Sequence, residues 1–73
     1  MLPQAAVEML EFDVKDAKAA AVNGDPLEGF EVLMVGLRHA ELVRNEGHPW
    51  GEELVRQYQN AIDRYLQEHG LRL

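Results

Sequence analysis

Apolar residues recur every three or four positions along the last third of the chain, which is the spacing of one helix face. The set comprises Trp50, Leu54, Tyr58, Ala61, Ile62, Tyr65 and Leu66. Pro49 suits the first position of a helix, and His69-Gly70 is typical of a helix end. The pattern predicts an amphipathic helix over about 49–69.

A second helix is predicted over about 26–46, with Asp25 as its cap and Gly47 as its terminator. Its apolar positions form one stripe and a second group beside it: Leu27, Phe30, Leu33, Met34, Leu37 and Ala40, then Val32, Val35, Leu42 and Val43. A helix that is apolar on more than one side is covered on more than one side. We therefore expect this helix to be central and partly covered by another copy of the chain.

The first segment, over about 3–22, carries two conflicting patterns. The alanine-rich run at 17–21 favours a helix, whereas residues 10–15 alternate strictly between apolar and charged, as a strand does. A lone strand needs a partner strand, and the rest of the chain supplies none. We expect a helix that ends at Asn23-Gly24. The alternative is an edge strand, within 8–15, that pairs across a dimer.

These segments predict a single all-α domain over 1–73, a helical hairpin preceded by an N-terminal helix. The short turns at Asn23-Gly24 and Gly47-His48 favour antiparallel neighbours. A chain of 73 residues is near the size at which one core supplies only a few kcal/mol. Because the chain has no cysteine for disulfides, we expect homo-oligomerisation to complete the core.

The amino-acid composition excludes several kinds of active site. The chain contains no serine, threonine or cysteine, so it has no hydroxyl or thiol nucleophile of the usual kinds except its tyrosines. The same absence excludes a GxxxxGK[ST] phosphate loop and thiolate zinc sites. We therefore expect a non-enzymatic protein with no cofactor and no catalytic residue.

The net charge of −6 indicates which partners to expect. Most acids of the first half lie between positions 8 and 31, where only two lysines oppose them. Nucleic-acid binding needs a basic stripe, so we expect no nucleic-acid partner, whereas a basic protein partner is compatible with the charge. The most apolar run, 32–37, is too short to span a membrane, and the first residues lack the pattern of a signal peptide. We expect a cytoplasmic protein that binds no membrane.

Two groups of residues are candidate sites. The candidate self-association interface lies on the second helix and comprises Phe30, Leu33, Met34, Gly36, Leu37 and Ala40. Gly29 and Gly36 lie seven residues apart there, which predicts close contact with another helix, either in the same chain or across a dimer axis. The candidate ligand or anion site comprises His48, Trp50 and Gly51, at the start of the third helix. The alternative interpretation of these three residues is packing at the end of the hairpin.

No metal site is predicted. The chain has no HxxxH or ExxH motif of the kind that helical metal sites use, and His39 and His69 have no His, Asp or Glu three or four residues away. Glu41 continues the apolar stripe of the second helix, and we expect it either to be buried against Arg38 or Arg44 or to lie where the stripe reaches solvent.

Three functional hypotheses follow. The leading one is a non-enzymatic, self-associating interaction or scaffold module. The second is a small regulatory protein that docks its acidic first segment, with Glu8, Asp13 and Asp16, on a basic protein. The third is a ligand- or metal-binding helical bundle with a pocket near His39, Glu41 or Trp50.

Overall fold

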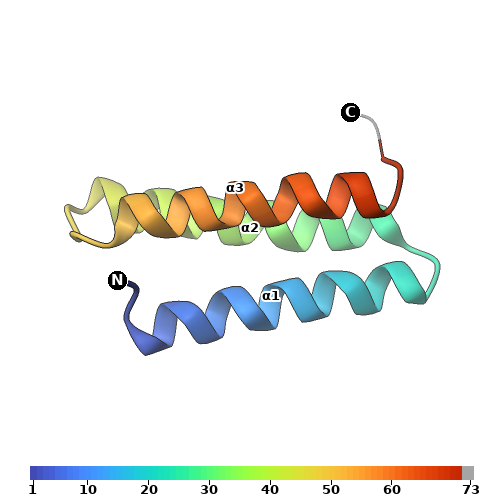
Figure 1. The fold of residues 1–73 in the computed structure, drawn as a ribbon, viewed down its shortest axis with the longest axis horizontal. Helices are drawn as coiled ribbons and strands as arrows, with labels where there is room; N and C mark the ends of the chain where they lie inside the picture. Colours follow the sequence, from blue (N-terminus) through green and yellow to red (C-terminus); the bar gives the residue numbers. More distant parts are fainter. Residues whose placement is uncertain (72–73) are drawn as a thin grey trace.

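The computed structural model describes residues 1–71, which form three antiparallel helices in a body of 37 × 23 × 16 Å (Figure 1). The helices are α1 (Gln4–Val22), α2 (Pro26–Asn45) and α3 (Gly51–Glu68). α2 packs along both α1 and α3, whereas α1 and α3 touch at few residues. The all-α fold with a central second helix is therefore confirmed. Residues 8–15 lie within α1, so the strand alternative is wrong.

The helix ends follow the predicted punctuation. Asp25 caps α2, because its Oδ1 accepts a hydrogen bond from the backbone N–H of Glu28 at 3.1 Å. The glycine after each helix has a φ in the left-handed region that favours this residue: Gly24 at 90°, Gly47 at 90° and Gly70 at 62°. Glycine and aspartate thus replace the serine and threonine caps that this chain lacks.

The third helix starts two residues later than Pro49. Gly51 donates its backbone N–H to the carbonyl of His48 at 3.0 Å, which closes a tight turn over Pro49 and Trp50. Trp50, with φ −97° and ψ 0°, is the residue that precedes the first helical one. α2 also ends one residue earlier than predicted, at Asn45. Local turn bonds of this kind compete with the first and last helical turns, and periodicity does not report them.

The core consists of two clusters of buried side chains. One lies at the end of the bundle near the α2–α3 turn, and the other lies near the α1–α2 turn. Their buried members are Ala6, Ala40, Leu54, Val55 and Tyr58 in the first, and Ala17, Leu33, Ile62 and Tyr65 in the second. α1 contributes only alanines to the fully buried set, so it packs close to α2 through small side chains.

Two glycines of α2 accommodate two tyrosines of α3. A Cβ on Gly36 would overlap the ring of Tyr58, and a Cβ on Gly29 would overlap the side chain of Tyr65. The two glycines are seven residues apart, and so are the two tyrosines; this is about two helical turns, so the same close approach repeats along the helices. Both tyrosines are buried. The close contact predicted from the glycine spacing therefore lies within the chain.

The tyrosine hydroxyls extend this packing to α1. Tyr58 donates to Oδ2 of Asp13 in α1 at 2.6 Å. The Tyr65 hydroxyl lies 2.6 Å from the carbonyl of Pro26 in α2 and 3.5 Å from that of Ala17 in α1, and it can donate to either. Burial raises the pKa of Tyr58, and the hydrogen bond to the Asp13 carboxylate raises it further. Burial also raises the pKa of Tyr65, with a smaller contribution from the negative charge of Asp25. Both hydroxyls therefore stay protonated, as donors, well into the alkaline range.

Candidate functional site

The surface of α2 opposite the core carries three large exposed apolar side chains. Leu27 is 58% exposed, Val35 48% and Leu42 59%. Glu31 and Arg38, also exposed, lie between them. At 3.6 residues per turn these five positions fall within an arc of about 80°. We call this set, Leu27, Glu31, Val35, Arg38 and Leu42, the outer face of α2.

The predicted interface residues lie on the other side of the same helix. Leu33, Gly36 and Ala40 are buried in the core of their own chain. The remaining three, Phe30, Met34 and Leu37, are half-buried and pack against the cluster that contains Ile62 and Tyr65. These six side chains are thus used mainly within the chain. The outer face is the apolar surface of α2 that a second molecule can reach.

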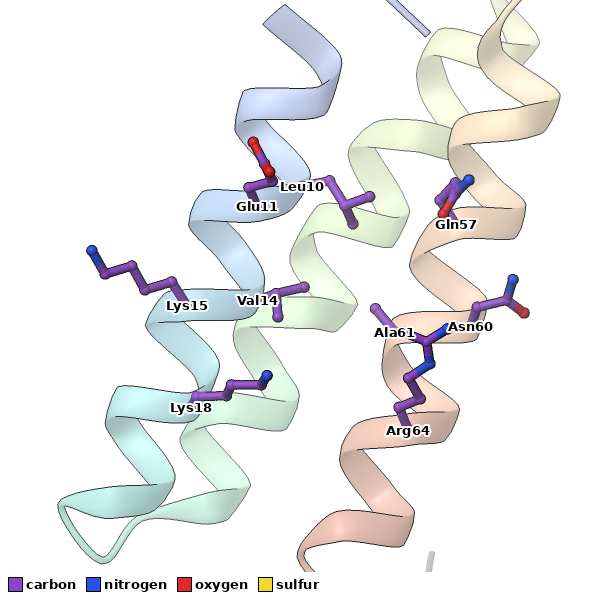
Figure 2. Close-up of a pocket in the computed structure, with 9 residues that line it drawn as sticks. All are labelled: Leu10, Glu11, Val14, Lys15, Lys18, Gln57, Asn60, Ala61 and Arg64. Carbon is purple, nitrogen blue, oxygen red and sulfur yellow. The ribbon is translucent and has the colours of Figure 1, made fainter. Parts of the chain in front are cut away.

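A groove of about 470 Å³ lies between α1 and α3, the two helices that barely touch. Figure 2 shows Leu10 and Val14 pointing into the groove from α1 and Ala61 pointing into it from α3. These three residues form an apolar floor. Sequence reasoning missed this groove, because it depends on how far α1 and α3 are held apart across α2.

Three basic residues and one acidic residue line the groove, although the chain is acidic overall: Lys15, Lys18 and Arg64, with Glu11. Figure 2 shows Lys18 pointing from α1 toward α3, whereas Arg64 runs along α3 beside Asn60 and Ala61, and Lys15 points away from the groove. Among residues 1–71 the one ion pair joins the Met1 amino group to Glu53 at 3.6 Å. Within these residues Lys18 and Arg64 therefore have no carboxylate partner within ion-pair distance. Basic side chains beside an apolar floor are complementary in charge and polarity to an anion with an apolar part.

The His48, Trp50 and Gly51 candidate site is organised by packing. The rings of His48 and Trp50 stack at 5.1 Å between centroids, and Trp50 packs against the first core cluster. Gly51 is buried, and a Cβ there would lie 2.5 Å from the Cα of Arg44. Its N–H is already bonded to His48, so this donor is not available to an anion. Gly51 allows α2 and α3 to approach closely at the hairpin end.

The remaining candidates do not converge on one site. Residues 1–71 contain no group of three His, Asp or Glu side chains arranged to hold a metal ion. The His69 ring contacts the Tyr65 ring at a tilt of 52°, with centroids 4.4 Å apart, and His39 is exposed on α2. Glu41 is half-exposed, and it forms no ion pair with Arg38 or Arg44 in the part of the chain that the structure describes.

The acids of the first segment are divided between two environments. Glu8 and Asp16 are exposed, whereas Asp13 is partly buried and accepts the Tyr58 hydroxyl. The sequence offered one signal for this: Asp13 shares a helix face with Ala6 and Ala17, the two buried residues of α1. Asp13 therefore serves the core, and the acidic surface of α1 is smaller than its charge count implies.

Comparison with known protein families, with curated proteins and with solved structures finds no match. Within residues 1–71, the helices are too short or too polar to cross a bilayer.

Proposed function

We propose that this chain is a non-enzymatic interaction module that works by self-association. The observation that carries the proposal is the exposure of Leu27, Val35 and Leu42 together on the central helix. Isolated exposed apolar residues are ordinary on protein surfaces, but here three of them share one helix face, in a strip that Glu31 and Arg38 interrupt. The lack of serine, threonine and cysteine nucleophiles supports a function in binding rather than covalent catalysis.

The energy available from this strip indicates how strong the association is. Covering the exposed half of each of the three side chains contributes roughly 1 kcal/mol apiece at about 25 cal/mol per Å². A micromolar dissociation constant corresponds to about 8 kcal/mol, after the loss of free translation and rotation has been offset. The three apolar side chains alone therefore fall short of it. Association through α2 needs further complementary contacts, and it is in the micromolar range or weaker.

Sedimentation equilibrium of matched variants tests this proposal. Val35→Gln with Leu42→Gln makes the outer face polar and keeps good helix formers at exposed positions, so circular dichroism should not change. The matched control is Phe12→Gln, since Phe12 is 69% exposed but lies on α1. We expect the wild type and the control to self-associate and the double variant to remain at 8.3 kDa. A wild-type mass of 8.3 kDa up to about 1 mM would contradict the proposal.

The groove between α1 and α3 favours a second function, the binding of a small amphiphile that carries a carboxylate. Its volume of about 470 Å³ is in the range of small-molecule sites, and Lys18 and Arg64 supply the complementary charge. Calorimetric titration with octanoate is the test, with octylammonium as the control ligand of equal tail and opposite charge. We expect octanoate alone to bind, and Lys18→Gln with Arg64→Gln to weaken it about tenfold. Equal binding of both ligands would refute charge recognition.

A further inference from the structure

The outer face of α2 carries two charges that have no partner among residues 1–71. Glu31 and Arg38 are both exposed, and in residues 1–71 neither lies within ion-pair distance of an opposite charge. They are seven positions apart, about two turns, which is too far for the neighbour pairing that occurs at i+3 or i+4. A contact that covers the apolar strip must also accommodate one negative and one positive charge.

The residues along this face are arranged about a midpoint: the apolar positions on its two sides correspond, and the acidic position on one side corresponds to the basic position on the other. It reads apolar, acidic, apolar, basic, apolar at positions 27, 31, 35, 38 and 42. Leu27 and Leu42 share a midpoint between positions 34 and 35, and Glu31 and Arg38 share the same midpoint. A second α2 running antiparallel about this point brings each Leu27 to the partner's Leu42. It also brings each Glu31 to the partner's Arg38, with the two Val35 side chains at the centre.

We propose that a second copy of this chain covers the outer face of α2, in an antiparallel two-fold pairing centred beside Val35. This inference rests on the proposed self-association and specifies its geometry. The pairing is isologous, which means that both copies use the same surface, so the contact of Glu31 with Arg38 occurs twice. Because the surface of each copy is then occupied, the assembly stops at a dimer. Leu27, at one end of the strip, is covered by Leu42 from the other end.

Charge selects this orientation over the parallel one. In a parallel pairing Glu31 faces its own copy and Arg38 does likewise, which places like charges together twice. The antiparallel pairing converts both contacts into opposite-charge pairs. From Leu27 to Leu42 the contact is about 22 Å long on a single helix, well below the roughly 800 Å² per partner of a standard interface. The dimer therefore forms at micromolar concentrations or above.

Charge reversal is the first test of this geometry. Glu31→Arg and Arg38→Glu each place like charges together twice in a homodimer, so sedimentation equilibrium should show dissociation constants raised roughly tenfold or more at low salt. An equimolar mixture of the two variants should recover wild-type affinity as a heterodimer, as should the doubly reversed chain. Asp63→Arg, an exposed reversal on α3, is the matched control and should change nothing.

Cysteine cross-linking then fixes the orientation, because the native chain has no thiol of its own. Leu27→Cys mixed with Leu42→Cys should form a disulfide between the two variants under mild oxidation, whereas each variant alone should not. Rapid cross-linking of either variant alone would overturn the antiparallel arrangement.

The two proposals fail in distinguishable ways. A wild-type chain that dimerises with unchanged affinity after charge reversal overturns this pairing and leaves self-association intact. A wild-type chain that stays monomeric up to about 1 mM overturns both proposals.

Discussion

Replacing Gly36 by alanine should destabilise this protein, although alanine is the better helix former. In an open helix the change gains about 1 kcal/mol. Here the new Cβ would overlap the Tyr58 ring and lie 2.6 Å from Oδ2 of Asp13 and 2.7 Å from Cζ of Tyr58. The ring cannot move aside cheaply, because Tyr58 is fully buried in the core.

The size of the effect follows from three contributions. Overpacking of a core costs typically 1–3 kcal/mol. Moving the ring also weakens the 2.6 Å bond from Tyr58 to the Asp13 carboxylate, and a hydrogen bond to a charged group contributes about 1.5–3 kcal/mol. After the gain in helix propensity is subtracted, we expect a net loss of about 2–3 kcal/mol. This is a large part of the stability of a domain of this size.

Urea unfolding followed by circular dichroism measures this loss directly. The informative control is the same substitution in a Tyr58→Leu background, where the ring that meets the new methyl group is absent. There the cost of Gly36→Ala should shrink to near zero or become a gain. A stabilisation of about 1 kcal/mol in the wild-type background would refute the close approach of Tyr58 to α2.

Three further outcomes are expected. Raising the pH above about 10 should lower the unfolding free energy, because tyrosines ionise near that pH in the unfolded chain while the folded state keeps Tyr58 and Tyr65 protonated. Urea titrations across that range should show that Tyr58→Phe makes the unfolding free energy depend less steeply on pH, and an unchanged dependence would count against the buried hydroxyl. Asp25→Ala should cost about 1 kcal/mol in thermal or urea unfolding by removing the cap of α2, whereas Asp25→Asn, which keeps a capping oxygen, should cost much less. Leu33→Ala, at a position only 1% exposed, should cost about 2–5 kcal/mol, and a loss below about 1 kcal/mol would place this side chain outside the core.

The sequence predicts the helices well because each one is marked by local chemistry. Asp25 and the glycines after each helix act within a few residues of where they stand, so their effect can be read without a fold. The alternation at residues 10–15 misleads only when it is considered alone. Within α1 it places Leu10 and Val14 along one side of the helix, facing the groove.

The position of the exposed surface on α2 could not be predicted from the sequence. The apolar positions of α2 extend around much of the helix, and periodicity does not reveal which arc the other helices cover. α1 and α3 cover the arc with Leu33 and Ala40, because Gly29 and Gly36 allow the tyrosines of α3 to approach there. Leu42 is left on the opposite side. The α1–α3 groove could not be predicted from the sequence either, since it depends on the relative positions of three helices.

The central claim, self-association through the outer face of α2, is tested most directly by the mass of the unmodified chain in solution. Sedimentation equilibrium from about 1 µM to about 1 mM spans the affinities expected for a contact along one helix. The account predicts a mass that rises from 8.3 kDa toward twice that value and then levels off. A mass that stays at 8.3 kDa throughout would contradict self-association, and one that keeps rising beyond the dimer would contradict two-fold closure.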